Sequence, residues 1–138
     1  MSRSCVLIVD DEPYVTAIVG QKLRQTGFDV IVADNGEEAY QIACTERLNI
    51  IVTDYQMPIL SGFELAVKLR ANPGTADIPV LMLTARGHQL SPRDRLRTNI
   101  QFLLPKPFSV KELARKVEEL ALSENDALDP VGRENRAV

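Results

Sequence analysis

Aromatic residues, cysteine and histidine are scarce in this chain, and tryptophan is absent. Aromatic side chains make up 5% of the 138 residues, whereas hydrophobic residues make up 45%, so the core must be built from Val, Ile, Leu and Ala. The two cysteines, Cys5 and Cys44, are too few for a disulfide framework and lie in apolar segments. We expect both to be reduced thiols that pack as small hydrophobic side chains.

Long hydrophobic runs and an excess of positive charge are also missing. The apolar run 5–9 ends at once in acidic residues, far short of an export signal or of the roughly 20 apolar residues of a membrane span. We therefore expect a cytoplasmic protein without a membrane span. Sixteen Lys and Arg against nineteen Asp and Glu give a formal charge of −3. Because this balance lacks the basic footprint of a phosphate-backbone binder, direct nucleic-acid binding is not expected.

What the chain does contain is an alternation, repeated five times, of short β-branched apolar runs with stretches of helical period. This pattern is typical of βαβ units around a parallel sheet. The expected strands are 5–9, 28–33, 50–53, 78–83 and 102–104. Only the second is half polar, which predicts one edge strand and four strands buried on both faces.

Capping signals mark the expected helix starts, and the length fits one domain of about 100–200 residues. A side-chain oxygen that accepts from the first turn, followed three residues later by an acid, occurs four times: Asn35 with Glu38, Ser61 with Glu64, Ser91 with Asp94 and Ser109 with Glu112. After Leu122 the apolar period fades into polar residues. We expect a single domain over 1–124 and a flexible C-terminal tail over 125–138.

The residues that follow the expected strands carry the chemistry, because ligands of parallel α/β sheets bind outside the carboxyl ends of the strands. These positions hold acids after the first and third strands, a hydroxyl after the fourth and an ammonium group after the fifth: Asp10, Asp11, Glu12, Asp54, Thr84 and Lys106. A lone Asp at a strand end often serves only a turn or a cap. Because four strand ends together supply groups suited to phosphoryl chemistry, a functional site is favoured over a set of unrelated turns and caps.

Three carboxylates at one edge of a sheet need a counterion. Held within about 4–5 Å, each pair repels by about 3–4 kcal/mol at an effective dielectric constant near 20, unless a cation lies among them or one stays protonated. Acids without His or Cys neighbours suit Mg²⁺, and with Thr84 and Lys106 they are typical of phosphoryl transfer. Asp54 is the best candidate nucleophile, because it is the single acid at its strand end.

Four blocks of this sequence resemble the receiver domains of two-component response regulators: Val6–Pro13, Asp54–Gly62, Thr84–Ala85 and Lys106–Phe108. The resemblance covers Ser4 to about Leu122. It implies an α/β, flavodoxin-like, doubly wound sheet of five parallel strands in the order 2-1-3-4-5, with helices on both faces. It also implies that Asp54 accepts a phosphoryl group from a sensor histidine kinase or a phosphotransfer protein.

The same resemblance implies roles for the surrounding residues. Asp11, Asp54 and the backbone carbonyl of Gln56 would hold Mg²⁺, with Asp10 alongside. Thr84 and Lys106 would contact the phosphoryl oxygens and report their presence, and the peptide bond between Lys106 and Pro107 would be cis.

One position limits what the resemblance says about output. Leu103 replaces the aromatic switch residue that the family usually places three positions before the Lys. We therefore expect Thr84 to switch the loop 85–90, and expect Arg93 and Arg97 beyond it to meet an unidentified downstream protein. His88, the single histidine, has no partner at ligand spacing and is expected to be a surface residue.

The sequence therefore predicts a stand-alone receiver of the chemotaxis-regulator kind, a phosphoacceptor switch that is not an enzyme. The alternative is a Mg²⁺-dependent phosphohydrolase with an Asp nucleophile. Such enzymes usually carry Asp-x-Asp after the first strand, whereas here Pro13 stands two residues beyond Asp11. Flavin binding on the same topology is disfavoured, because an acidic rim repels the flavin phosphate.

Overall fold

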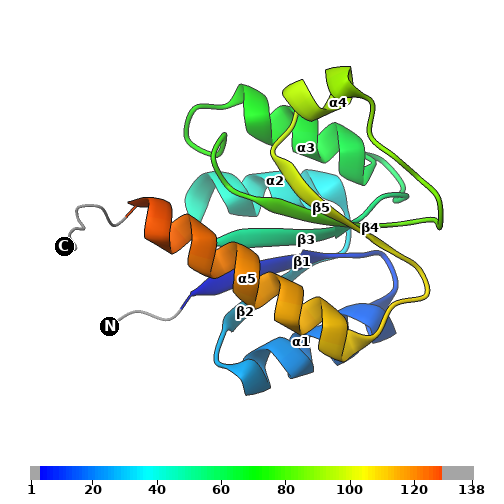
Figure 1. The fold of residues 1–138 in the computed structure, drawn as a ribbon, viewed down its shortest axis with the longest axis vertical. Coiled ribbons are helices and arrows are strands. Elements are labelled where there is room, and N and C mark those ends of the chain that lie inside the picture. The colour runs from blue at the N-terminus through cyan, green and yellow to red at the C-terminus, as the bar shows by residue number, and fades with distance from the viewer. Residues whose placement is uncertain (1–3, 129–138) are drawn as a thin grey trace.

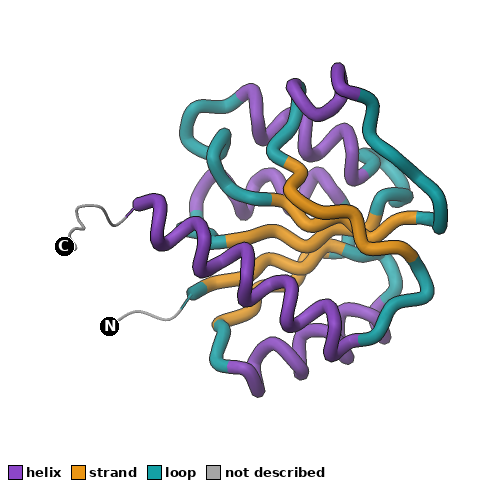
Figure 2. Tube along the Cα trace, in the orientation of Figure 1, coloured by secondary structure: helices purple, strands orange, loops and turns teal. Residues whose placement is uncertain are grey.

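A five-stranded parallel sheet forms the middle layer of the computed structural model, which describes residues 4–128, with side chains as far as residue 121. The strands are β1 (Cys5–Val9), β2 (Asp29–Ala33), β3 (Ile50–Asp54), β4 (Val80–Thr84) and β5 (Ile100–Pro105). Their order is β2-β1-β3-β4-β5, and Figure 2 shows them as one layer between the helices. The flavodoxin-like order that the resemblance implies is confirmed.

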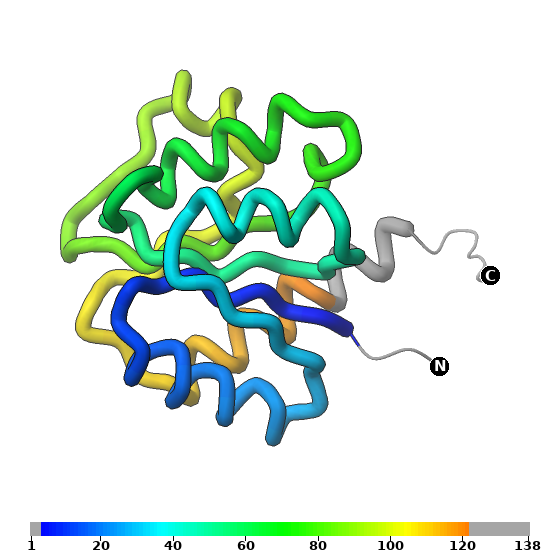
Figure 3. Tube along the Cα trace, turned by 180° about the vertical axis from the view of Figure 1, so that it is seen from behind, coloured from blue at the N-terminus to red at the C-terminus, as the bar shows by residue number. Residues whose placement is uncertain are grey.

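Helices cover both faces of this sheet. They are α1 (Pro13–Thr26), α2 (Gly36–Thr45), α3 (Gly62–Ala71), α4 (Pro92–Leu96) and α5 (Val110–Leu128). α1 and α5 lie on one face, and α2, α3 and α4 lie on the other (Figure 1). From behind, α2 and α3 run side by side (Figure 3), where the Asn72 amide donates a 3.0 Å hydrogen bond to the Tyr40 hydroxyl. None of the helices in residues 4–128 is both long and apolar enough to cross a membrane.

The strand residues divide between two apolar cores, because successive side chains of a strand point to opposite faces. Along β1, Val6 and Ile8 pack with the α1 and α5 side, and Leu7 and Val9 pack with the α2 and α3 side. All four side chains are at most 1% exposed. The acids at the carboxyl ends of β1 and β3 therefore extend from the most deeply packed part of the sheet.

Some sequence-based expectations about burial are wrong. The strand order places β5 at the second edge, so Phe102 and Leu103 are only half-buried, whereas the sequence predicts a strand over 102–104 that is buried on both faces. Cys44 is an exposed thiol on α2, and Cys5 is half-buried. Both thiols are free, as expected. The helical period predicts which face of a helix packs on the sheet. It does not predict which residues at the border of that face remain exposed.

The predicted caps are found, with one full capping box. The Ser61 hydroxyl accepts from the Glu64 amide at 3.1 Å, and the Glu64 carboxylate accepts from the Ser61 amide at 2.9 Å. Asn35, Ser91 and Ser109 accept from the amide three residues on. α5 continues to Leu128, past the residue where we expect the tail to begin. Residues 129–138 lie outside the described residues, so the flexible tail stays a prediction.

Candidate functional site

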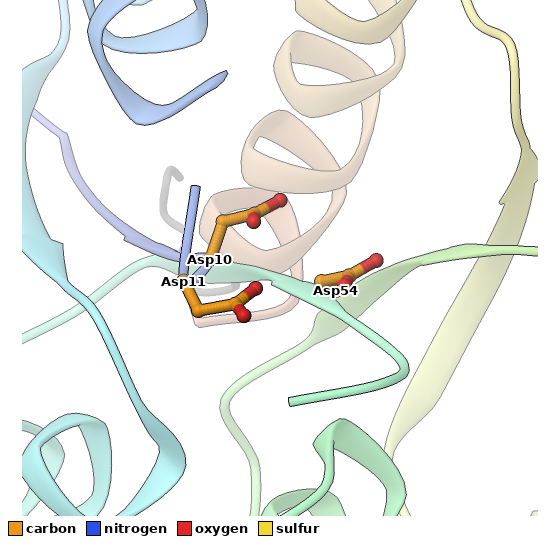
Figure 4. Close-up of side chains that lie close together, drawn as sticks. All are labelled: Asp10, Asp11 and Asp54. Carbon is orange, nitrogen blue, oxygen red and sulfur yellow. The ribbon is translucent and has the colours of Figure 1, made fainter. Parts of the chain in front are cut away.

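Three carboxylates meet at the carboxyl ends of β1 and β3. These strands are parallel neighbours, and the register that pairs Val9 with Thr53 places the next residues, Asp10 and Asp54, side by side. One oxygen each from Asp10, Asp11 and Asp54 lies within 4.8 Å of the others, and Figure 4 shows the three side chains close together. Asp10 and Asp54 are buried, and Asp11 is exposed. The acids that the sequence singles out are thus brought together.

The Asp10 carboxylate is buried without full hydrogen bonding. Its Oδ1 accepts from the Glu12 amide at 2.9 Å, whereas Oδ2 has no hydrogen-bond partner among the described residues. Desolvation raises the pKa of this carboxyl to about 6, with added repulsion from Asp54 and Asp11, against the opposing effects of the Glu12 amide and Lys106. A buried, unsatisfied carboxylate oxygen is unfavourable. A hard divalent cation among these oxygens would relieve it, so the donor set fits Mg²⁺.

Lys106 supplies the positive charge of the site. Its Nζ lies 2.5 Å from Oδ1 of Asp54, and its backbone amide donates to the Thr84 carbonyl at 2.8 Å. Desolvation opposes the charged form, but the hydrogen bond and the charge of Asp54, with the further acids nearby, raise the pKa of Lys106 above its ordinary value. The Lys106–Pro107 bond is cis, the geometry that the family resemblance implies. Lys106 therefore stands charged against the candidate nucleophile.

A tight return of the chain after β3 holds Asp54 in place. The Gly62 amide donates to the Tyr55 carbonyl at 2.8 Å, which brings the start of α3 against the end of β3. A Cβ added at Gly62 would lie 2.1 Å from the carbonyl oxygen of Asp54. Only glycine allows this close approach of the two backbones.

These groups open onto a cavity of about 590 Å³. Of the residues that the sequence predicts, Asp11, Asp54, Gln56, Thr84 and Lys106 line it. Leu103 does not. It is half-buried and packs into the core on the α2 and α3 side. The cavity therefore brings together carboxylates, the Thr84 hydroxyl and the Lys106 ammonium group. Leu103, at the position where the family usually has an aromatic switch residue, lies outside it.

Sequence reasoning missed several residues that line the same cavity, His88 above all. His88 is half-buried, and its ring centroid lies 4.8 Å from that of Tyr55 with the planes tilted by 50°. The expectation of a plain surface residue is wrong. The turn after β4, in which the His88 amide donates to Ala85 and Gly87 has φ of +84°, brings the ring back. Two features of the sequence could have indicated this contact. Tyr55 directly follows Asp54, and Gly87 directly precedes His88 in the loop after β4.

Arg93 and Arg97 lie one turn apart at α4, as the sequence predicts, and both are exposed. The Arg97 guanidinium lies 5.7 Å from the centroid of the Phe63 ring and 3.9 Å from the Asp94 carboxylate. α4 starts only at Pro92, capped by Ser91. The loop between Thr84 and α4 is therefore long, in line with the expected region of switching.

Comparison with known proteins gives a consistent family. The sequence model described as the response regulator receiver domain matches residues 6–118. The phosphate regulon transcriptional regulatory protein PhoB of Pseudomonas aeruginosa is 32% identical over 118 residues, which are 86% of this chain and 52% of that protein. The chain thus spans about half the length of the curated relatives it matches.

Two solved structures bear on the acidic cluster. The receiver domain of sensor histidine kinase PA1611 from Pseudomonas aeruginosa, with a magnesium ion coordinated in its active-site cleft, is 27% identical with a TM-score of 0.75, over 87% of this chain and 98% of that one. Response regulator TrrA from Thermotoga maritima, in complex with Mg²⁺ and BeF, is 30% identical with a TM-score of 0.74, over 85% and 98% of the two chains.

Proposed function

The chain belongs to the response regulator receiver domain family, and on that premise we propose that Asp54 accepts a phosphoryl group from the phosphohistidine of a sensor histidine kinase or phosphotransfer protein. Members of this family are phosphoacceptors and not enzymes in the ordinary sense. One observation carries the assignment to Asp54. Asp54 is the buried carboxylate that contacts Lys106 and also borders the cavity of about 590 Å³.

Three of the lining groups have a part in this step. A carboxylate oxygen of Asp54 forms the new P–O bond while the P–N bond of the donor breaks. The Lys106 ammonium lies against the Asp54 carboxylate, so it offsets charge where the phosphoryl oxygens arrive. The Thr84 hydroxyl, at the end of β4 and on the cavity wall, donates a hydrogen bond to one of those oxygens. Its movement toward the phosphoryl group then pulls on the loop 85–90.

We also propose that Asp10, Asp11 and Asp54, with the backbone carbonyl of Gln56, bind Mg²⁺. The oxygen-only cluster within 4.8 Å and the unsatisfied Asp10 Oδ2 support this, as do the magnesium-containing receivers of similar fold. When bound, Mg²⁺ neutralises charge that develops on the transferred group. The cation is expected to be needed for phosphoryl uptake.

Mg²⁺ is expected to stabilise the fold, and more so at higher pH. The folded pKa of Asp10, about 6, exceeds its ordinary 3.8, so proton binding stabilises the metal-free fold at low pH and this contribution is lost as pH rises through 6. At 100 times its Kd, Mg²⁺ adds about 2.7 kcal/mol, which raises Tm by about 5–10 °C. Melting curves with and without Mg²⁺ at about pH 7.5 should show this shift, and at about pH 5 a smaller one.

Two substitutions control that experiment. Asp10→Asn removes the ionised buried carboxylate, so it should raise the metal-free Tm at neutral pH and blunt the response to Mg²⁺. Asp77→Asn alters an exposed acid paired with Arg70 outside the cluster, and it should leave the response unchanged. A Tm that ignores millimolar Mg²⁺ at every pH would refute the metal site.

Phosphoryl uptake itself is tested by intact-mass spectrometry after incubation with acetyl phosphate. We expect one added phosphoryl mass in the presence of Mg²⁺ and none with EDTA. Hydroxylamine should remove the group, because it cleaves acyl phosphates and leaves phosphoserine and phosphothreonine intact. A stable adduct that resists hydroxylamine, or no adduct at all, contradicts the proposed function. Repeated turnover of an aryl phosphate would instead favour the phosphohydrolase.

The output surface is proposed to include the loop 85–90, α4 and β5. Hydrogen exchange with and without beryllofluoride should change between Ala85 and Leu104, because Thr84 sits at the start of this loop. Arg93→Glu combined with Arg97→Glu should weaken binding to a downstream protein and leave phosphoryl uptake intact. Protection changes restricted to the residues that line the cavity would show that this output route is wrong.

Stand-alone operation, a cytoplasmic location and the absence of direct nucleic-acid contacts are proposals about the whole protein. The curated relatives are about twice as long as the matched region. The mass of the protein detected in cell extract would test stand-alone operation.

The donor is proposed to dock beside the site at the groove lined by Tyr14, Ile18 and Phe108. The 66% exposed Tyr14 and 48% exposed Ile18 of α1 support this docking surface.

A further inference from the structure

The cavity beside Asp54 has one wall that the phosphoryl chemistry leaves unused. The cationic groups, Lys106 beside Asp54 and the exposed Arg86, account for binding an anion, because each attracts negative charge. Beyond them, the Tyr55 and His88 rings line the same cavity. At about 590 Å³, the space exceeds what a phosphoryl group alone fills. The cavity therefore leaves room for part of the donor beside the group that it transfers.

The two rings come from different loops and are held against each other. Tyr55 follows β3 directly, and His88 is returned by the turn after β4. Their planes are tilted by 50° at a centroid distance of 4.8 Å, so they do not cover each other face to face. Both are half-buried and border the cavity. Both residues therefore offer surface to the cavity that Asp54 also lines.

We infer that Tyr55 and His88 form a subsite for an aromatic leaving group, so that the cavity prefers donors whose phosphoryl group is carried by an imidazole. Aromatic rings attract each other in offset or edge-to-face arrangements by about 0.5–1.5 kcal/mol beyond the area they bury. Acetate and ammonia, the leaving groups of acetyl phosphate and phosphoramidate, have no ring and gain nothing there. The inference rests on the proposed function of Asp54. It adds a contact with the leaving group by which the site would select among donors.

The step balances without a further reactant. A donor imidazole carries the phosphoryl group on one nitrogen and a proton on the other. As the Asp54 oxygen bonds to phosphorus, the P–N bond breaks and its electron pair stays with the nitrogen. The protonated far nitrogen makes the leaving group a neutral imidazole. The rings contact this group before and during its departure, so their removal should raise the apparent KM for the ring donor.

Three small phosphodonors that differ in their leaving group test the inference: monophosphoimidazole, phosphoramidate and acetyl phosphate. Initial rates of phosphoryl uptake are measured by intact mass at several donor concentrations with saturating Mg²⁺. For His88→Ala we expect the efficiency with monophosphoimidazole to fall roughly three- to tenfold, the factor that corresponds to the ring contact. The two donors without a ring should change by less than about twofold.

Matched variants separate a ring contact from other causes. His88→Phe retains a ring without its nitrogens and should keep most of the efficiency with monophosphoimidazole. Gln89→Ala alters an exposed neighbour in the same loop that does not line the cavity, and it should behave as the wild type. Circular dichroism and Tm of each variant show that the fold is retained.

The outcomes are distinct. Equal losses with all three donors, or no loss with any, overturn the subsite and leave the rings as part of the wall. Equal losses in His88→Ala and His88→Phe, restricted to the ring donor, also overturn a stacking role, because they assign the effect to the nitrogens. A wild-type protein that takes no phosphoryl group from any of the donors contradicts the proposed function itself.

Discussion

Replacing Asp54 with Asn is expected to abolish phosphoryl uptake from every donor while the fold is retained. The amide has nearly the same size and hydrogen-bonding reach as the carboxylate, but it lacks the anionic oxygen that attacks phosphorus. Asp54 is 6% exposed and closes the end of β3, so an isosteric change disturbs the packing little. The adduct seen by intact-mass spectrometry in the wild type should be missing at all times of incubation.

The same variant should also alter the charge balance of the site. Lys106 loses its partner at 2.5 Å, and Asp10 loses a repelling neighbour. We therefore expect the pKa of Asp10 to move down and the response of Tm to Mg²⁺ to shrink, because one of three carboxylates is gone. Asp77→Asn serves as the matched control in an exposed loop and should take up the group normally. An undiminished adduct on Asp54→Asn would place the acceptor elsewhere, with the cavity-lining Asp11 and Glu12 the next to test.

Among the described glycines, Gly62 is where replacement by Ala is expected to have the largest effect on stability. Its Cβ would lie 2.1 Å from the carbonyl oxygen of Asp54 and 3.1 Å from the Cα of Tyr55, and both are backbone atoms that no rotamer change can move. Overpacking of this kind costs about 1–3 kcal/mol and occasionally more, and we expect the upper end of that range. For this chain length, about 3 kcal/mol lowers Tm by about 10 °C.

The relief of that clash should also disturb the site. The loop 55–61 must move away from β3, which displaces Gln56 and weakens Mg²⁺ binding beyond the loss of stability. Gly74→Ala is the matched control, because its Cβ would meet only the Asn72 side-chain oxygen at an ordinary 3.5 Å. Thermal melts of both variants, with and without Mg²⁺, measure the two effects. A Gly62→Ala protein that melts with the control and responds fully to Mg²⁺ would show that the return after β3 is not rigid.

Local patterns in the sequence determined the elements and most of the acidic site. Alternating apolar runs and helical periods mark the strands and helices, and the Ser61 capping box forms as its spacing predicts. The positions of Asp10 and Asp54 at strand ends were enough to expect them together, because parallel strands end at one edge of a sheet. These features depend on residues close in the chain or on a general property of the sheet, so a single sequence carries them.

Only the tertiary structure decided which residues from separate loops meet. The approach of His88 to Tyr55 and the exposure of Cys44 and β5 depend on strand order, on turn geometry and on what covers each face. A turn with Gly87 in the left-handed region redirects a side chain four residues beyond Thr84, and no periodic pattern records that direction. Contacts of this kind depend on the backbone dihedral angles of many residues along the chain. The local sequence restricts each angle to a few allowed regions but does not determine which combination the folded chain adopts.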